Sequence, residues 1–378
     1  MSLVLDEHRE YLADVARLDA FDAAVRDAVH PGDIVLDLAS GTGILGLLAC
    51  QAGARRVYAI EMGPIVELAR GLALANGFAD RIVWVNEVST RANLPERVDL
   101  VVTDGAGRFG FDGGIIETLS DARRRFLKPG GRIIPNNLTL SIAPVDAREP
   151  AAHIAFWTRP VRGLSMAPAA AIARNTGYPR HIRENELVAA PADLVTFDPS
   201  VAAGPLTGRA AFRVERTATV YGIAGWFSAE LAPGVTLTNS PCARNRINRR
   251  NVFLPLHEAV PVAPGDCVAV SMFIQPAALI VRWRVEVASA NASVRHVTDA
   301  STFEGMLISR EEMARMRPDF RPTLTPAGRA RKTVLDLCDG VRVLREIESE
   351  VLERHRELFA GQAEAAAFVA EVVTRYSS

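Results

Sequence analysis

The feature that most constrains this chain is a glycine-rich turn at residues 39–46, between a short apolar run and an apolar stretch with helical spacing. The run covers residues 34–36 and the helical spacing covers residues 45–52. Gly41 and Gly43 let the backbone approach a ligand, and the start of the helix offers free amides to it. The pattern predicts a strand, a ligand-binding turn and a helix, as in nucleotide-binding α/β folds.

Two cofactors compete as explanations of this turn, beside a tight turn that holds no ligand. Gly41, Gly43 and Gly46 satisfy the GxGxxG spacing of dinucleotide-binding proteins. Asp37 within the strand argues against a pyrophosphate and suits a ligand with an ammonium group, such as S-adenosylmethionine. Glu61 ends the next apolar run, where a carboxylate accepts ribose hydroxyls from either cofactor or simply faces solvent. We therefore predict an S-adenosylmethionine site.

Apolar patterns divide the chain into three zones. Residues 1–140 alternate strand-like and helical runs, which is typical of a parallel sheet with covering helices. Residues 141–295 carry short β-rich runs with turn signals and predict an antiparallel sandwich or barrel, with an arm near residues 163–186. Residues 296–378 place apolar positions at helical spacing and predict a C-terminal helical segment.

Composition excludes several functional classes. The 378 residues carry a formal net charge of -1, which argues against a general nucleic-acid or membrane-surface binder. Aromatic residues make up 6%, which leaves few surfaces for stacking single-stranded nucleic acid. The sequence shows no signal peptide and no apolar run of membrane-spanning length. The four cysteines are dispersed and no metal-ligand spacing occurs, so we expect a cytoplasmic protein with reduced thiols and without a metal site.

Several segments resemble the protein arginine methyltransferases, within the class I S-adenosylmethionine-dependent methyltransferases. In the first zone they are residues 35–45, 52–62, 75–82 and 127–135. In the second zone, residues 225–227, 238–241, 252–253 and 261–266 are similar to that family's barrel. The resemblance implies an α/β fold with a seven-stranded class I methyltransferase (Rossmann-like) sheet, followed by an antiparallel β-barrel-like domain. It also implies S-adenosylmethionine as the cofactor and a homodimer formed through the arm.

The resemblance assigns cofactor contacts to matching positions. In the family an arginine upstream of the glycine turn grips the cofactor carboxylate, and Arg17 matches it, unless it simply pairs with Asp14 on a solvated helix. The family's glutamate that faces the adenine falls where Ser89 and Thr90 stand here. The predicted cofactor-binding residues are Arg17, Asp37, Ala39, Gly41, Gly43, Glu61, Met62, Ser89 and Thr90.

The acceptor side departs from the family. Arginine methyltransferases hold the guanidinium between two glutamates of one loop, because each carboxylate accepts a pair of hydrogen bonds from the planar cation. Here the first glutamate is Asp104 and the second is Gly113, beside Asp112. Residues 246–248 replace the family's Thr-His-Trp loop. Asp104 and Asp112 are the predicted catalytic residues, which orient a nucleophile or take its proton, with a turn-capping role as the alternative for Asp104.

These departures predict a non-standard methyl acceptor. Positive charge gathers in the altered loops at Arg108, Arg244, Arg246, Arg249 and Arg250. An anionic or carboxylate-bearing acceptor explains the arginines, and a solvated arginine-rich loop is the alternative. The leading hypothesis is a methyltransferase that acts on a peptide, a protein or a polar small molecule. A genuine protein arginine N-methyltransferase and a degenerate regulator that binds cofactor or peptide stay open.

The C-terminal segment carries a second resemblance. Residues 335–347 resemble the helical part of winged-helix modules that hold leader peptides of ribosomally made natural products. This likeness implies a peptide-binding role for residues 325–376. A helical bundle that caps the barrel or forms a dimer contact is the alternative. Acids and bases are nearly balanced here, so DNA binding is not expected.

Overall fold

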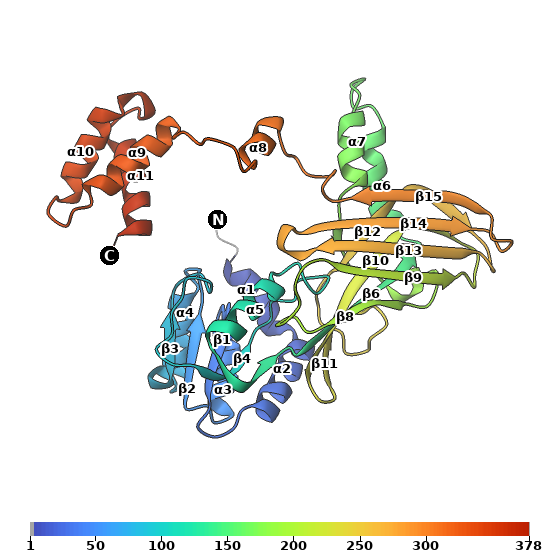
Figure 1. Ribbon diagram of the computed structural model, residues 1–378, viewed down its shortest axis with the longest axis horizontal. Helices are drawn as coiled ribbons and strands as arrows, with labels where there is room; N and C mark the ends of the chain where they lie inside the picture. The colour runs from blue at the N-terminus through green and yellow to red at the C-terminus, as the bar shows by residue number, and fades with distance from the viewer. Residues whose placement is uncertain (1–3, 378) are drawn as a thin grey trace. The chain divides into compact units, whose positions relative to one another are not determined.

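The computed structural model describes residues 4–377, which form two compact units. The first unit ends at Met306 and the second begins at Leu307. In the first unit, a parallel sheet with helices is followed by two antiparallel sheets (Figure 1). Within residues 4–377, the first unit has two hydrophobic cores and the second unit has one.

The parallel sheet has five strands in the order β3-β2-β1-β4-β5. They are β1 (Ile34–Leu38), β2 (Arg56–Ile60), β3 (Ile82–Val85), β4 (Val98–Val102) and β5 (Leu127–Ile134). The central strand β1 is buried along its whole length, as expected for a parallel strand between two neighbours. The prediction of a Rossmann-like sheet is confirmed, with five strands rather than seven. The count differs because the next strand, β6, leaves this sheet and pairs antiparallel with β10.

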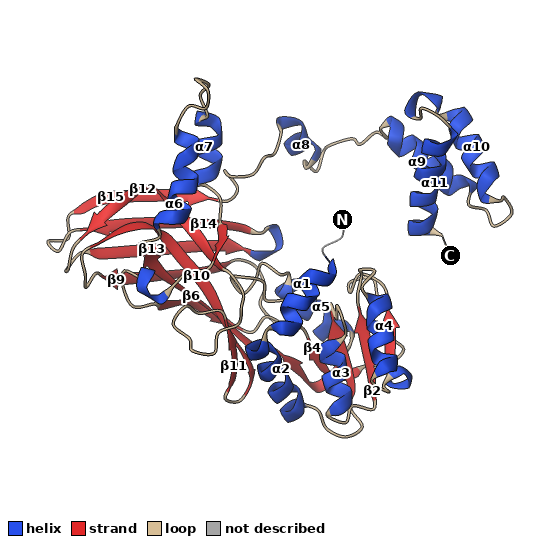
Figure 2. Cartoon of the chain, turned by 180° about the vertical axis from the view of Figure 1, so that it is seen from behind, coloured by secondary structure: helices blue, strands red, loops and turns tan. Residues whose placement is uncertain are grey.

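Helices join the parallel strands and pack against them (Figure 2). Asp14 begins the second helix as its N-cap, because its side chain accepts a hydrogen bond from the backbone amide of Arg17 at 3.2 Å. The helices of this part are α1 (Val4–Ala13), α2 (Val15–Ala28), α3 (Ile44–Gln51), α4 (Val66–Ala75), the 3₁₀ turn η1 (Ala79–Arg81) and α5 (Ile115–Arg125).

Two antiparallel sheets complete the first unit, as predicted from the β-rich pattern of residues 141–295. One sheet has the order β7-β12-β10-β6-β8, with β11 paired to β10, and the other has the order β15-β14-β13-β9. Burial alternates along β13 and β14, so one face of the second sheet lies on the core and the other faces solvent. The strands are β6 (Asn137–Val145), β8 (Ala192–Phe197), β9 (Leu206–Arg213), β10 (Ala218–Ala232), β11 (Val235–Thr238), β12 (Asn251–Val262), β13 (Cys267–Gln275), β14 (Ile280–Ala288) and β15 (Val294–Ser301), with the 3₁₀ turn η4 (Pro276–Ala278) before β14.

A helical excursion interrupts the antiparallel strands after β6 and projects from them in Figures 1 and 2. It contains α6 (Arg148–Ala155), η2 (Phe156–Thr158), α7 (Ala167–Arg174), β7 (Tyr178–Arg180) and η3 (Glu184–Glu186). Phe156 and Leu164 are 52% and 67% exposed on it. The arm predicted near residues 163–186 therefore belongs to a longer excursion, and its role in a homodimer stays a prediction.

The second unit is helical, as predicted. Its helices are α8 (Arg310–Arg315), α9 (Pro326–Leu337), α10 (Leu344–Arg354), η5 (Arg356–Leu358) and α11 (Gln362–Tyr376). Helices α9, α10 and α11 share a small core of Val334, Leu337, Ile347, Val351, Val369 and Val372. Residues 307–377 contain no strand, so they form no β-wing, and a peptide-binding role stays a prediction.

Membrane-spanning helices, metal-ligand clusters and disulfides are absent from residues 4–377. No helix within residues 4–377 has the length and apolar character needed to span a bilayer. Across the same residues, no three His, Cys, Asp or Glu side chains gather in a way that could hold a metal ion. All four cysteines are free thiols.

Candidate active site

The glycine-rich turn between β1 and α3 bends as its sequence predicts. Ala39, Gly41 and Gly43 have φ angles of 54°, 54° and 76°, a region that glycine adopts without strain. Glu61 holds the turn, since its Oε2 accepts a hydrogen bond from the Gly41 amide at 2.9 Å. Its Oε1 accepts one from the Gly63 amide at 2.7 Å. A carboxylate has further acceptor positions, so the predicted ribose contact fits this geometry.

Two rings lie directly on this turn. A Cβ atom at Gly43 would be 2.5 Å from the ring of Trp84, and one at Gly41 would be 2.8 Å from the ring of His8. A side chain at either position would have to displace one of these rings, in addition to adopting an unfavourable backbone angle. His8 and Trp84 were not predicted from the sequence, because each comes from a different element and neither belongs to a recognisable motif.

Asp37 of β1 is fully buried. Its Oδ2 accepts a hydrogen bond from the Gly46 amide at 2.8 Å, while its Oδ1 is buried without a partner in the chain. Burial raises the pKa of Asp37 to about 7, against the opposing effects of this hydrogen bond and the charge of Arg17. A buried acceptor that lacks a donor is costly, and a cofactor ammonium group is one donor that would satisfy it.

A pocket of about 190 Å³, the cofactor pocket, opens over the turn. It lies at the carboxyl ends of the parallel strands, where α/β proteins bind ligands. The side chain of Ser40, one of its lining residues, has a buried Oγ without a hydrogen-bond partner. The residues that line it come from α1, α2, the turn and the end of β4: His8, Tyr11, Leu12, Arg17, Ala39, Ser40, Gly41, Thr42, Ile44 and Asp104.

Asp104, directly beyond β4, binds two arginines at once. Its Oδ2 accepts hydrogen bonds from Nε of Arg17 at 2.6 Å and from Nη2 of Arg249 at 2.9 Å. Its Oδ1 accepts one from Nη1 of Arg249 at 3.2 Å. Burial alone would raise the pKa of Asp104, but the charges of Arg249 and Arg17, with their hydrogen bonds, outweigh it and hold this pKa below its usual value.

Arg17 is buried and points to Asp104 rather than to Asp14. Its guanidinium carbon lies 5.6 Å from the centre of the Tyr11 ring and 5.4 Å from that of Phe21, within the range of cation–π attraction. Asp14 bonds instead to backbone amides, those of Arg17 and, at 2.7 Å, Asn248. The alternative of a simple Asp14–Arg17 ion pair is therefore wrong.

The loop between β4 and α5 separates the two predicted catalytic aspartates. Asp112 lines neither this pocket nor the second one described below. Its Oδ1 accepts hydrogen bonds from the amides of Arg108 at 2.7 Å and Phe109 at 2.8 Å, so it holds its own loop. A Cβ at Gly113 would lie 2.2 Å from the carbonyl oxygen of Gly105. The loop thus leaves no room for a side chain where the family has its second glutamate.

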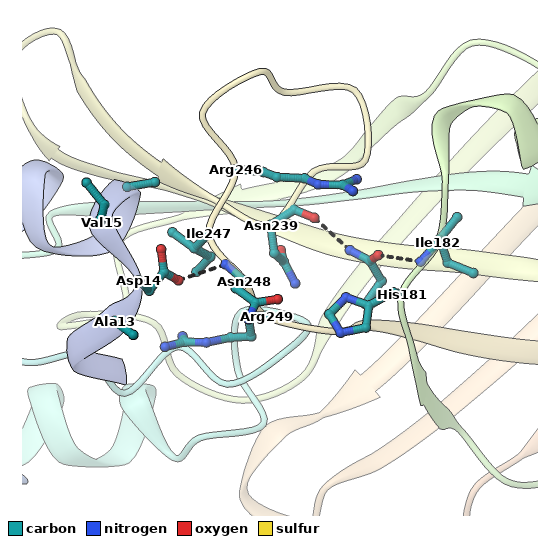
Figure 3. Close-up of a pocket in the computed structure, with 12 residues that line it drawn as sticks. Ala13, Asp14, Val15, His181, Ile182, Asn239, Arg246, Ile247, Asn248 and Arg249 are labelled. Carbon is teal, nitrogen blue, oxygen red and sulfur yellow. Dashed lines mark hydrogen bonds between the residues drawn. The ribbon is translucent and has the colours of Figure 1, made fainter. Parts of the chain in front are cut away.

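A second pocket, of about 410 Å³, lies where α2 begins and the segment 239–251 of the antiparallel domain approaches it (Figure 3). We call it the acceptor pocket. Arg246 and Arg249 line it, and Asp14 is the one carboxylate among its described lining residues. Burial and the charges of Arg250 and Arg246 lower the pKa of His181, another lining residue. The charges of neighbouring arginines therefore act on this pocket.

Two buried asparagines hold the segment that carries these arginines. Nδ2 of Asn239 donates to the carbonyl oxygens of Arg108 at 2.8 Å and Arg250 at 3.1 Å. Nδ2 of Asn251 donates to the carbonyl oxygen of Asn239 at 2.7 Å, and its Oδ1 accepts from the Ile182 amide at 3.1 Å (Figure 3). These bonds tie the two ends of the segment 239–251 together and fix the backbone at Arg250, next to Arg249.

Of the predicted cofactor residues, Arg17, Ala39 and Gly41 line the cofactor pocket. Asp37, Gly43 and Glu61 belong to the strand ends and the turn beside it without lining it, and Met62, Ser89 and Thr90 lie apart from it. Met62 is 73% exposed. Ser89 and Thr90 form a turn beyond β3, and the Ser89 carbonyl oxygen accepts a hydrogen bond from Nη2 of Arg125. None of the three is among the residues that line the pocket. Their predicted contacts with the cofactor stay predictions.

The chain is similar in sequence to known methyltransferases. The family description of ribosomal protein L11 methyltransferase (PrmA) matches residues 17–136. Protein arginine N-methyltransferase 6 of Xenopus laevis is 28% identical over 287 residues, which cover 71% of this chain and 83% of that protein. Protein arginine N-methyltransferase PRMT10 of Oryza sativa subsp. japonica is 38% identical over 143 residues, or 37% of this chain and 38% of that protein.

Solved structures show the same fold. Protein arginine methyltransferase 10 of Arabidopsis thaliana superimposes with a TM-score of 0.68 at 20% identity, over 79% of this chain and 98% of that one. The PRMT1 enzyme–prozyme complex of Trypanosoma brucei with AdoHcy gives a TM-score of 0.70 at 21% identity, over 78% of this chain and 97% of that one.

The parallel sheet and the glycine-rich turn thus lie in the part of the chain that is similar to methyltransferases. The family match extends over the turn, and the structural matches extend over both kinds of sheet. The chain is a class I methyltransferase that uses S-adenosylmethionine and resembles the protein arginine methyltransferases in sequence and architecture.

Proposed function

We propose that the enzyme methylates an acceptor that presents a neutral or anionic group rather than a guanidinium. One observation carries the proposal: two guanidinium groups, those of Arg17 and Arg249, already share the carboxylate of Asp104. The three side chains together carry one excess positive charge. A cofactor carboxylate bound by Arg17 would offset that charge, but both oxygens of Asp104 are already paired with arginines, so an incoming guanidinium would find no free carboxylate there. A neutral or anionic acceptor needs none.

S-adenosylmethionine supplies an electrophilic methyl group on a sulfonium. We assign its ammonium end to the neighbourhood of Asp37 and its ribose to Glu61, with the turn at Gly41 beneath it. We assign its carboxylate to Arg17, which lines the cofactor pocket. In that arrangement the chain binds and orients both reactants, which supplies much of the rate of a displacement reaction.

Asp104 orients the acceptor in this proposal and does not take its proton. A carboxyl group whose pKa lies below the usual value is a weak base, and two arginines keep Asp104 in that state. Asp104 lines the cofactor pocket and Arg249 lines the acceptor pocket, so their contact marks the boundary between the two. The methyl group would cross at this boundary.

Protein arginine N-methylation is the second candidate, and on sequence likeness alone it is the stronger one. The relatives with 28% to 38% identity are named as arginine methyltransferases. For this chain to act in the same way, Arg249 would have to release Asp104 before the substrate guanidinium could reach that carboxylate.

Methyl-labelled S-adenosylmethionine separates the two candidates. Calorimetry first establishes cofactor binding by the purified chain. The chain is then incubated with labelled cofactor and two peptide sets that differ only in arginine against glutamine, and with fractionated small molecules. We expect label in acceptors that yield no methylarginine after acid hydrolysis, and turnover lowered by roughly tenfold or more in Asp104→Asn with cofactor binding kept. Labelled methylarginine as the main product would overturn the proposal in favour of the second candidate.

A further inference from the structure

Arg249 fills a site shaped for a guanidinium group. Its two terminal nitrogens bind both oxygens of Asp104, at 2.9 and 3.2 Å, in the parallel arrangement typical of arginine and carboxylate. Nη1 also lies 3.3 Å from the carbonyl oxygen of Gly107. The rings of Tyr11 and Phe227 are centred 5.8 and 5.9 Å from the guanidinium carbon. The site therefore offers a carboxylate, a carbonyl and two aromatic rings.

We propose that Arg249 determines acceptor specificity by occupying this site, so that an acceptor guanidinium cannot enter it. The inference rests on the proposed function and names the residue that enforces it. The Arg249 side chain is 12% exposed and lines the acceptor pocket, so it stands between an arriving acceptor and Asp104. Asn239 and Asn251 hold the ends of its segment together and fix the backbone of the following residue, Arg250.

Arg17 does not have this role, although it binds the same carboxylate. It contacts Asp104 through Nε alone and lies on the cofactor side. Loss of Arg249 would leave Asp104 with one cation and would free the two bonds that Arg249 makes to it, together with the bond to the Gly107 carbonyl oxygen. The vacated site would then suit a guanidinium better than an ammonium ion, because only the planar group can form two parallel bonds.

Methylguanidinium is the probe for this site. It is titrated by calorimetry into the full chain saturated with S-adenosylhomocysteine, for the wild type, Arg249→Gln and the control Arg250→Gln. Arg250 is the next residue in the same segment and is exposed. Its substitution by glutamine removes the same charge as Arg249→Gln. We expect Arg249→Gln to bind methylguanidinium at least about tenfold more tightly than the wild type and the control. Adding Asp104→Asn to Arg249→Gln should abolish the gain.

Three results would overturn the proposal. They are equal affinity in the wild type and Arg249→Gln, an equal gain in Arg250→Gln, and a gain that survives Asp104→Asn. Circular dichroism confirms that each variant is folded. If Arg249→Gln does not fold, Arg249→Lys replaces it, because an ammonium group leaves part of the site free. It should bind the probe about threefold more tightly than the wild type, and no gain would overturn the inference.

Binding of the probe does not depend on turnover, so this result and the proposed function fail separately. Methylarginine formation by the wild type would contradict the proposed function. An unchanged affinity for methylguanidinium after loss of Arg249 would contradict the role of Arg249 alone. A non-arginine product together with that unchanged affinity would keep the function and assign specificity to other residues.

Discussion

Asp37 is a carboxyl group enclosed by β1 and α3, and burial raises its pKa from 3.8 to about 7. Because the folded-state pKa is the higher one, the folded protein keeps this proton in a range of pH where the unfolded chain releases it. The contribution of Asp37 to stability is therefore complete below pH 3.8 and is lost as the pH rises through 7. A pKa difference of about three units between the folded and unfolded states corresponds to about 4 kcal/mol in the free energy of unfolding.

Asp37→Asn should remove this dependence, since the amide stays neutral and its oxygen can still accept the Gly46 hydrogen bond. We expect the free energy of unfolding of the variant, relative to the wild type, to rise by about 2–4 kcal/mol between pH 4.5 and 7.5. Urea unfolding at several pH values measures it. Asp80→Asn, at an exposed position of η1, is the control and should give a flat difference. A flat difference for Asp37→Asn would contradict the burial argument.

The loop between β4 and α5 requires glycine at position 113, because the backbone of the same loop lies very close to that residue. At Gly113 an added Cβ would lie 2.2 Å from the carbonyl oxygen of Gly105 and 2.8 Å from the amide nitrogen of Gly107. Gly113→Ala should therefore lower the free energy of unfolding by about 1–3 kcal/mol. Gly71→Ala in α4, where nothing lies within 4 Å, should be neutral or stabilise by up to about 1 kcal/mol. Equal losses in urea unfolding would show that this contact does not constrain the loop.

Strands β1 to β4 could be predicted from the sequence, because each is a short, mostly apolar run bounded by turn residues. By contrast, β5 begins at Leu127 and runs through Pro129, Gly130 and Gly131, which predict a turn. The paired groups at the site could not. Asp104 meets Arg17 and Arg249 across 87 and 145 positions of sequence, and no local pattern encodes such contacts. The resemblance to the arginine methyltransferases predicts a glutamate at position 113, where this chain has glycine. Only the backbone contact shows why no side chain fits there.

At the scale of the whole molecule, the chain has separate hydrophobic cores. The two cores of the first unit draw their buried residues from between Phe21 and Ala300, and the core of the second unit draws them from between Val334 and Val372. A domain as small as the second unit rarely gains more than about 3–5 kcal/mol from its core. Two-state unfolding is therefore not expected of the full chain.

We expect calorimetric heating to give two transitions, the weaker one from the second unit. Ile347 is 4% exposed in that core, and Ile347→Ala should cost about 2–5 kcal/mol, enough to lower or abolish the weaker transition. The other transition and S-adenosylmethionine binding should not change, because the cofactor pocket lies within the first unit. Leu335→Ala, on α9 and 45% exposed, should have a small effect on both transitions. If Ile347→Ala moves both transitions together, the two units unfold as one, and the separate cores do not divide the stability of the chain.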